Sequence, residues 1–351
     1  MSFFDDELLT RVLDNDPTLT DMSTRIYTDA EASVLGNAIS GNYVLRTLNF
    51  CYSDLSGDRA SLLLSKIPRN IERLTLCNCE IKSQGVKLLA RLALECCISF
   101  LDLRHNEIGD EGARLLSAAM KHKECTWTSL ILGNCMIGDT GARHLTKGLG
   151  LRGFQQLDLR GNEIGNRGIF ALSRALSLGI DLERLDLRDN RIGNEGAHSL
   201  ALALTYTHTC DTLKNLNLTG NHIGDSGAEM LAKALKLNST LKCLNLSGNS
   251  IGEVGAEAFL DAMEYNSAVF HLNLSQNTVS REVREEIAKV LEANRTGKRK
   301  ARTLVNSEAN SNSVGNGDGR SGRRGQRVSK SVPDRRPRGF FALLRYAVAC
   351  S

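Results

Sequence analysis

The sequence predicts an α/β solenoid, in which short strand–turn–helix units stack around one continuous core. Three observations predict this fold class. The pattern L-x-x-L-x-L-x-x-N-x-I-G-x-x-G-A-x-x-L recurs along the 351 residues, glycine is frequent with 31 residues, and aromatic residues make up only 5%. Many glycines and few rings favour repeated tight turns over a core of bulky side chains. A unit this short cannot bury its apolar face alone, so its neighbours must stack on it.

The pattern is clearest in residues 182–200, and its asparagine position returns nine times along the chain. The steps between these positions are 26 to 31 residues. The positions are Ser53, Cys79, Asn106, Cys135, Asn162, Asn190, Asn221, Asn249 and Asn277. Spacing this regular indicates structural repeats rather than chance similarity.

Each unit is expected to begin with a short strand. Leu185 and Leu187 alternate with Asp186 and Arg188, so the leucines face the core and the charged residues face the opposite side. The asparagine that follows, Asn190 in this unit, is expected to turn inward. There its side chain would satisfy backbone amides that the turn leaves unpaired.

A turn and a helix are expected to complete the unit. Gly193 suits the turn, Asn194 is predicted to be the N-cap of the helix, and Ala197 packs closely at its start. Three leucines are then predicted to form the inward stripe of the helix: Leu200, Leu202 and Leu204.

Both ends of the repeat array differ from its middle. Residues 281–292 lack the two glycines and are highly charged, which is typical of a helix that closes a stack with a polar outer face. We therefore predict three regions. Residues 1–40 hold an N-terminal capping helix and a degenerate repeat, residues 41–292 hold about nine repeats of which the last acts as a cap, and residues 293–351 form a disordered tail.

The predicted tail is strongly basic. Residues 292–351 hold 14 Lys and Arg against 4 Asp and Glu, which leaves 30 against 36 for residues 1–291. Basic clusters followed by the apolar segment 340–348 are compatible with contact to an anionic membrane, to nucleic acid or to the nuclear import machinery. A solvated tail without a partner is the alternative.

The opening residues predict no secretory signal, and no run approaches the roughly 20 apolar residues that cross a bilayer. Ten cysteines without framework spacing indicate reduced thiols. These features predict a cytoplasmic protein, with the nucleus as the alternative.

The repeats resemble the ribonuclease-inhibitor class of leucine-rich repeats, which is also found in intracellular NOD-like receptors and in the Ran GTPase-activating protein. The resemblance covers roughly residues 19–291. It implies a horseshoe-shaped leucine-rich-repeat solenoid with a parallel sheet on the concave side and helices on the convex side. The motif specifies the scaffold and leaves the variable positions free, so it does not by itself assign a function.

The variable strand positions predict a protein-binding surface on the concave face. Three repeats carry Asp-x-Arg, and neighbouring strands about 4.8 Å apart would stack these pairs side by side. We name the following set the central patch: Asp102, Arg104, His105, Ile131, Asp158, Arg160, Asp186, Arg188 and Asp189. The alternative interpretation is a solvated ladder of self-paired charges, each pair contributing about 0–1 kcal/mol. In the later repeats, Asn217, Asn245 and Asn273 are interpreted as a stacked hydrogen-bonding column.

The sequence contains no recognisable catalytic, metal-binding or cofactor-binding motif. The histidines are scattered, and the cysteines lack the spacing of a zinc site. Trp127, the single tryptophan, is interpreted as a core residue, with an exposed interface anchor as the alternative. We therefore predict a non-enzymatic scaffold that binds a protein partner and takes neither cofactor nor small-molecule substrate.

Two other functions stay open at this stage. One is activation of a small GTPase, as in the Ran GTPase-activating protein. The other is actin binding, because residues 15–19, Asn-Asp-Pro-Thr-Leu, resemble the entry to the repeats in tropomodulin.

Overall fold

The computed structural model describes residues 6–149, 153–205 and 212–297. These residues lie in one compact unit. The predicted disordered basic tail and its apolar segment lie outside the described residues from 298 onward.

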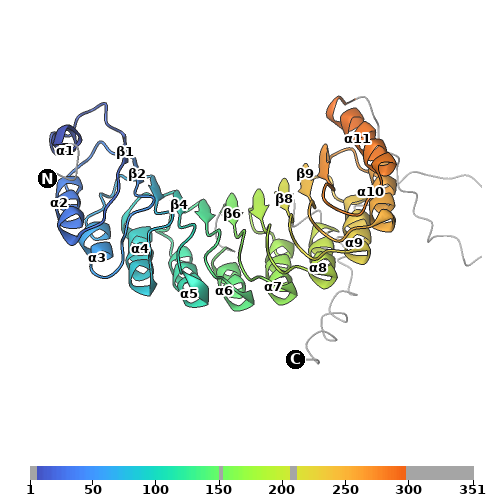
Figure 1. Ribbon diagram of the computed structural model, residues 1–351, viewed down its shortest axis with the longest axis horizontal. Coiled ribbons are helices and arrows are strands. Elements are labelled where there is room, and N and C mark those ends of the chain that lie inside the picture. The colour runs from blue at the N-terminus through green and yellow to red at the C-terminus, as the bar shows by residue number, and fades with distance from the viewer. Residues whose placement is uncertain (1–5, 150–152, 206–211, 298–351) are drawn as a thin grey trace, which may run out of the picture. The chain divides into compact units, whose positions relative to one another are not determined.

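The described residues form a regular alternation of strands and helices (Figure 1). The strands are β1 (Asp21–Ser23), β2 (Thr47–Asn49), β3 (Arg73–Thr75), β4 (Phe100–Asp102), β5 (Ser129–Ile131), β6 (Gln156–Asp158), β7 (Arg184–Asp186), β8 (Asn215–Asn217), β9 (Cys243–Asn245) and β10 (His271–Asn273). The helices are α1 (Asp6–Leu13), α2 (Asp29–Ile39), α3 (Arg59–Leu64), α4 (Ser83–Glu95), α5 (Gly109–Met120), α6 (Asp139–Leu149), α7 (Asn166–Ser177), α8 (Asn194–Thr205), α9 (Asp225–Leu235), α10 (Glu253–Tyr265) and α11 (Arg281–Arg295).

The strands form a single parallel sheet in the order in which they occur along the chain. Figure 1 shows the strands along the inner side of this unit and the helices along its outer side. This arrangement confirms the predicted α/β solenoid with a concave sheet and convex helices. The core lies between the two layers, where Leu157 of β6 is in register with Leu185 of β7 and both are buried. Each such leucine contributes about 1.5–3 kcal/mol through burial.

The inward asparagines join successive repeats, which confirms and extends their predicted role. Asn162 Oδ1 accepts hydrogen bonds from the N–H groups of Cys135 at 3.0 Å and Ile137 at 2.9 Å, both in the preceding repeat. Its Nδ2 donates to the carbonyl oxygens of Leu132 at 2.8 Å and Leu159 at 2.9 Å. The other asparagines that donate to the preceding repeat in this way are Asn106, Asn190, Asn221, Asn249 and Asn277.

A cysteine at the asparagine position changes the turn of the preceding repeat. The Cys135 thiol donates to the Leu103 carbonyl at 3.2 Å, but no amide oxygen is present to accept from Ile108. The Ile108 N–H instead bonds to the carbonyl of Asn106, and Gly109 donates to the carbonyl of Cys135 at 2.9 Å. Gly109 has φ +60°, a conformation that favours glycine, so this turn uses the glycine that the motif carries at this position.

Asn194 does not cap its own helix as the sequence predicted. It is the first residue of α8, and its Oδ1 accepts from Gly224 N at 2.8 Å and Gly227 N at 3.1 Å in the next repeat. Stacking places the first turn of one helix against the start of the next, so the cap acts between repeats. The residues that cap the following helix in this way are Asp110, Asp139, Asn166, Asn194 and Asp225.

The predicted inward stripe of α8 is wrong at one position. Leu200 and Leu204 are fully buried, whereas Leu202 is 49% exposed. Residues four apart share one face of a helix, and a residue midway between them lies on the opposite face.

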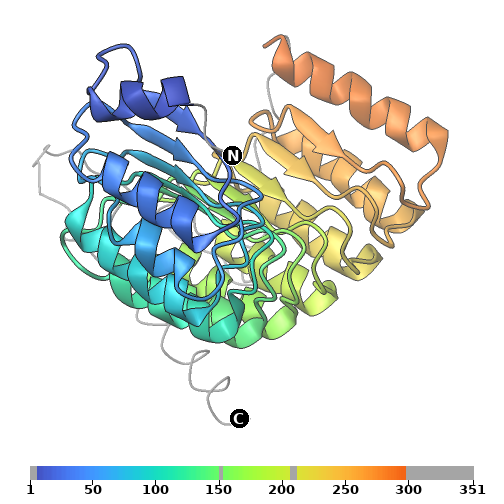
Figure 2. The ribbon, with the colours of Figure 1, turned by 60° about the vertical axis from the view of Figure 1, so that its left-hand side comes forward.

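Helices close both ends of the described unit (Figure 2). At one end α1 packs on α2, and at the other α11 packs on α10. Of the residues of α11, Ile287 and Leu291 are buried. The helix runs to Arg295, past the predicted start of the tail at residue 293, because Asn294 Nδ2 donates to the carbonyls of Asn266 at 3.0 Å and Val269 at 2.9 Å.

The caps between repeats predict a specific stability effect. Asp139 Oδ1 accepts from Gly165 N at 2.7 Å and Gly168 N at 2.8 Å. We expect Asp139→Ala to lower the free energy of unfolding by about 1–2 kcal/mol, because two N–H groups at the start of α7 lose their acceptor. Urea denaturation followed by circular dichroism measures this.

Asp139→Asn is the matched control, because Asn166 and Asn194 perform the same capping with an amide oxygen. This variant should retain most of the stability. If it is as unstable as Asp139→Ala, the carboxylate charge rather than the acceptor geometry stabilises the helix start.

Candidate protein-binding surface

The structure brings the residues of the central patch together on strands β4 to β7 and on the turns that follow them. The register places Asp102 beside Ile131, Ile131 beside Asp158, and Asp158 beside Asp186. These side chains belong to the sheet face opposite the leucines. The predicted proximity of the patch residues is therefore a property of the fold.

Three aspartates of the patch, Asp102, Asp158 and Asp186, are each paired with the arginine two residues further on. The nitrogen–oxygen distances are 2.6 Å for Arg104 and Asp102, 2.6 Å for Arg160 and Asp158, and 3.1 Å for Arg188 and Asp186. Oδ1 of each aspartate also accepts from the backbone N–H of its arginine. The aspartates thus close the ends of their strands as well as neutralising the arginines.

Two of these carboxylates are buried, which corrects their predicted role as contact residues. Asp102 and Asp158 are each 2% exposed, and Ile131 between them is 4% exposed. The interpretation as a solvated ladder of charges is wrong for these positions. The arginine side chains fold back over the carboxylates, so a partner meets guanidinium groups there.

A glycine in the middle of the patch allows this arrangement. A Cβ atom on Gly133 would lie 2.8 Å from Cγ of Arg160 and 3.4 Å from Cγ of Arg104. The absence of a side chain after β5 lets the two arginines approach each other from the neighbouring strands. Gly133 is the one glycine at this position of the repeat, and the sequence pattern assigned it no role.

The surface available to a partner consists of the three arginines and two turn residues. The arginine side chains are between 28% and 36% exposed. His105 and Asp189 are exposed, and both have positive φ in the turns after their strands. Hydrogen bonding to Asp102 raises the pKa of Arg104, and burial, together with the charge of Asp158, raises the pKa of Asp186.

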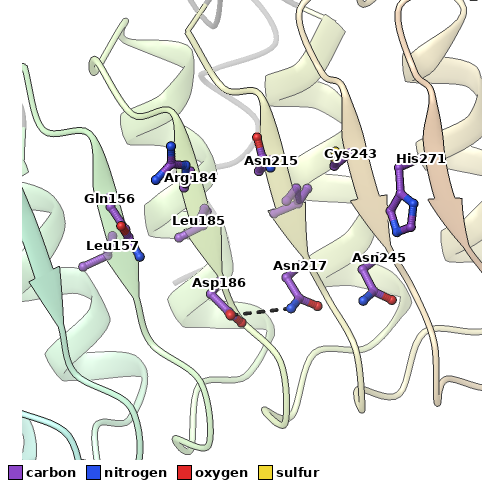
Figure 3. A pocket seen from close by; sticks show the side chains of 11 residues that line it. Gln156, Leu157, Arg184, Leu185, Asp186, Asn215, Asn217, Cys243, Asn245 and His271 are labelled. Atoms are coloured by element: carbon purple, nitrogen blue, oxygen red, sulfur yellow. Dashed lines mark hydrogen bonds between the residues drawn. The ribbon is translucent and has the colours of Figure 1, made fainter. Parts of the chain in front are cut away.

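A hollow of about 350 Å³ lies next to the patch on strands β6 to β10 (Figure 3). Its lining includes the first residue of each strand, in order Gln156, Arg184, Asn215, Cys243 and His271. The third strand positions Asp186, Asn217 and Asn245 also line it. The first strand position varies freely from repeat to repeat, so the sequence pattern did not single out this column.

The remaining candidate residues lie in the core. Trp127 is buried, in agreement with its interpretation as a core residue. Burial raises the pKa of the Cys79 and Cys135 thiols to about 12, so both are protonated at neutral pH. No cluster of three or more His, Cys, Asp and Glu side chains suited to a metal ion occurs within the described ranges.

Within the described part of the chain, no helix combines the length and the apolar character needed to cross a membrane.

Comparison with known proteins agrees with the repeat architecture. The family model described as Leucine Rich repeat matches residues 96–117, 154–173, 181–201, 209–232 and 237–260. NACHT, LRR and PYD domains-containing protein 14 of Mus musculus is 33% identical over 152 residues, which are 42% of this chain and 15% of that protein. NACHT, LRR and PYD domains-containing protein 2 of Homo sapiens is 33% identical over 147 residues, 40% of this chain and 14% of that protein. The chain thus spans about 15% of the length of these relatives.

Among solved structures, the chain is similar to Leiomodin-1 Actin-Binding Site 2 (ABS2). The TM-score is 0.34 with 22% sequence identity, over 38% of this chain and 75% of that chain. At this level of similarity nothing follows about the function of this chain.

Proposed function

We propose, on the premise that this chain is a leucine-rich-repeat protein of the ribonuclease-inhibitor type, that it is a non-enzymatic scaffold that binds a protein partner on its concave face. The observation that supports this proposal is the row of three arginines, Arg104, Arg160 and Arg188, each held by its own aspartate. We further propose that it acts in the cytoplasm, because its ten cysteines lack the spacing of a disulfide framework.

Held arginines suit binding for an energetic reason. A free arginine loses up to about 2 kcal/mol of rotamer entropy when a partner immobilises it. Here the ion pair with aspartate has already restricted the side chain, so less entropy is lost on association. The guanidinium nitrogens that remain exposed can donate to carboxylate or carbonyl oxygens of a partner.

The test compares the full-length chain with two double variants. Arg104→Gln/Arg160→Gln removes the two arginines that meet over Gly133. Arg143→Gln/Arg167→Gln removes the same charge from exposed positions on the outer helices α6 and α7. Proteins captured from a cell lysate are identified by mass spectrometry, and the dissociation constant of the purified partner is then measured.

We expect the patch variant to bind about 100-fold more weakly, because two charge-assisted hydrogen bonds at about 1.5 kcal/mol each are lost. The control variant should bind like the wild type. Circular dichroism must show that both are folded, and His105→Ala/Asp189→Ala tests the same surface through exposed residues alone. Equal affinity of all variants would contradict the proposal.

The alternatives are tested on the same preparation. Activation of a small GTPase predicts stimulated GTP hydrolysis, and actin binding predicts co-sedimentation with filaments. Contact of the basic tail with nucleic acid or an anionic membrane predicts binding that is lost in a chain ending at Gly297 and that weakens steeply with salt.

A further inference from the structure

The ends of β9 and β10 carry asparagines with hydrogen-bond donors. Asn245 lines the hollow, and Asn273 lies on the strand beside it. Asn245 Oδ1 accepts from Ser247 N at 3.1 Å, and Asn273 Oδ1 on the neighbouring strand accepts from Ser275 N at 3.0 Å. Only the oxygen of an amide can accept from N–H, so the orientation of both amides is determined. Their Nδ2 atoms are left without a hydrogen-bond acceptor among the described residues. The predicted stacked column is therefore a row of strand-end caps. Asn245 and Asn273 have free donors, whereas Asn217 Nδ2 donates to Asp186 Oδ2 at 3.5 Å.

Two further donors stand at the two sides of this row. Arg184, the first residue of β7, is exposed and has no carboxylate within ion-pair distance in the described part of the chain. His271, the first residue of β10, is exposed and lines the same hollow (Figure 3). Asp186 is the single carboxylate in the lining, and Arg188 already neutralises it at 3.1 Å. The hollow thus has an excess of donors and of positive charge.

We infer that this hollow binds an extended acidic segment of the protein partner, with one carboxylate on Arg184 and a second, four residues further along the segment, on His271. The inference rests on the proposed function and specifies the chemistry of the partner. Carboxylates are the natural complement of a guanidinium flanked by amide donors. A carbonyl oxygen of the segment would accept from the free Nδ2 group of Asn245.

The geometry of the sheet gives the spacing of four residues. From β7 to β10 the chain crosses three inter-strand steps of about 4.8 Å, or roughly 14 Å. An extended peptide that runs across the strands covers about 13–14 Å in four residues. Its side chains at positions i, i+2 and i+4 face the same side, so the middle one would lie over Asn215 and Cys243.

The experiment is a fluorescence-anisotropy titration of labelled nine-residue peptides with the full-length chain at pH 7. The first peptide carries two aspartates at i and i+4 in a Gly/Ser/Thr background. The second carries them at i and i+3, which places them on opposite faces of an extended chain, and the third carries asparagines instead. The basic tail is the same in every titration, so differences between the first two peptides report spacing and not total charge.

We expect the first peptide to bind about tenfold more tightly than the other two, and Arg184→Gln to abolish most of this preference. His271→Gln should weaken the first peptide as well. Arg167→Gln, which removes an exposed arginine from the outer helix α7, is the matched control and should preserve the preference.

The inference is overturned if the first two peptides bind equally, or if Arg184→Gln retains the preference for the first. Its failure can be distinguished from that of the proposed function. If the partner no longer binds Arg104→Gln/Arg160→Gln but binds Arg184→Gln as it binds the wild type, the proposed function stands and the acidic segment is rejected. A ligand that carries phosphate in place of carboxylate and competes more strongly than the first peptide would also reject it.

Discussion

Replacing Asn162 with alanine is expected to lower the free energy of unfolding by roughly 4 kcal/mol. The side chain is buried and joins two repeats through four short hydrogen bonds. Its loss leaves the N–H groups of Cys135 and Ile137 and the carbonyls of Leu132 and Leu159 without these partners. Each buried polar group left unsatisfied costs about 1–3 kcal/mol, of which water that enters the cavity recovers a part.

Urea denaturation monitored by circular dichroism measures this effect from the midpoint and slope of the transition. Asn215→Ala is the matched control. Asn215 is a half-buried asparagine on β8, two strands along from β6, and its side chain makes no hydrogen bond to the described residues. It should change stability by less than about 0.5 kcal/mol. A cost below about 1 kcal/mol for Asn162→Ala would mean that the asparagine ladder does not hold the repeats together.

Replacing Asp158 with arginine is expected to destabilise the protein by about 3–5 kcal/mol, because it puts an unpaired cation into a buried site. Arg160 donates to the Asp158 carboxylate from its backbone N–H at 3.0 Å and from Nε at 2.8 Å. The substitution removes both acceptors and places a second guanidinium beside the first. Thermal and urea-induced unfolding measure the loss.

Asp158→Asn is the informative comparison. An asparagine keeps an oxygen for the Arg160 N–H, as Asn217 does for Thr219 two strands further along the sheet. We expect Asp158→Asn to lower the free energy of unfolding by only about 1–2 kcal/mol, because it loses the ion pair with Arg160 but keeps the strand-end cap. If Asp158→Arg is as stable as the wild type, the Asp158 carboxylate lies in solvent, and the assignment of a buried ion pair between Asp158 and Arg160 is wrong. Binding at the patch is therefore tested at the arginines, because charge reversal at Asp158 tests folding.

The repeating pattern was sufficient to predict the fold because each constraint is local and recurs. The leucine alternation predicts the strand, and the inward asparagine follows from the unpaired amides of the turn. The pairing of Asp158 with Arg160 could be predicted in the same way, because residues two apart lie on one face of a strand.

The burial of Asp158 could not be predicted from the repeating pattern. It depends on where the arginine side chains lie, and that depends on the missing side chain of Gly133 one strand away. Likewise, Asn194 has the residue type of a cap, but its donors are 30 and 33 residues further along the chain. The hollow was missed because the first strand position is free in the motif, so no pattern draws attention to Arg184.

The capping between repeats gives the array a direction, and this has an evolutionary consequence. The starts of α6 to α10 each depend on a side chain of the unit before, for example Asp110 for Gly138 and Gly141 and Asp139 for Gly165 and Gly168. Deleting residues 139–165 would join Gly138 to Asn166 and present Gly168 to Asp110 in place of Gly141. Every donor would still meet an acceptor, so such genes can gain or lose whole units by unequal recombination without leaving an uncapped helix.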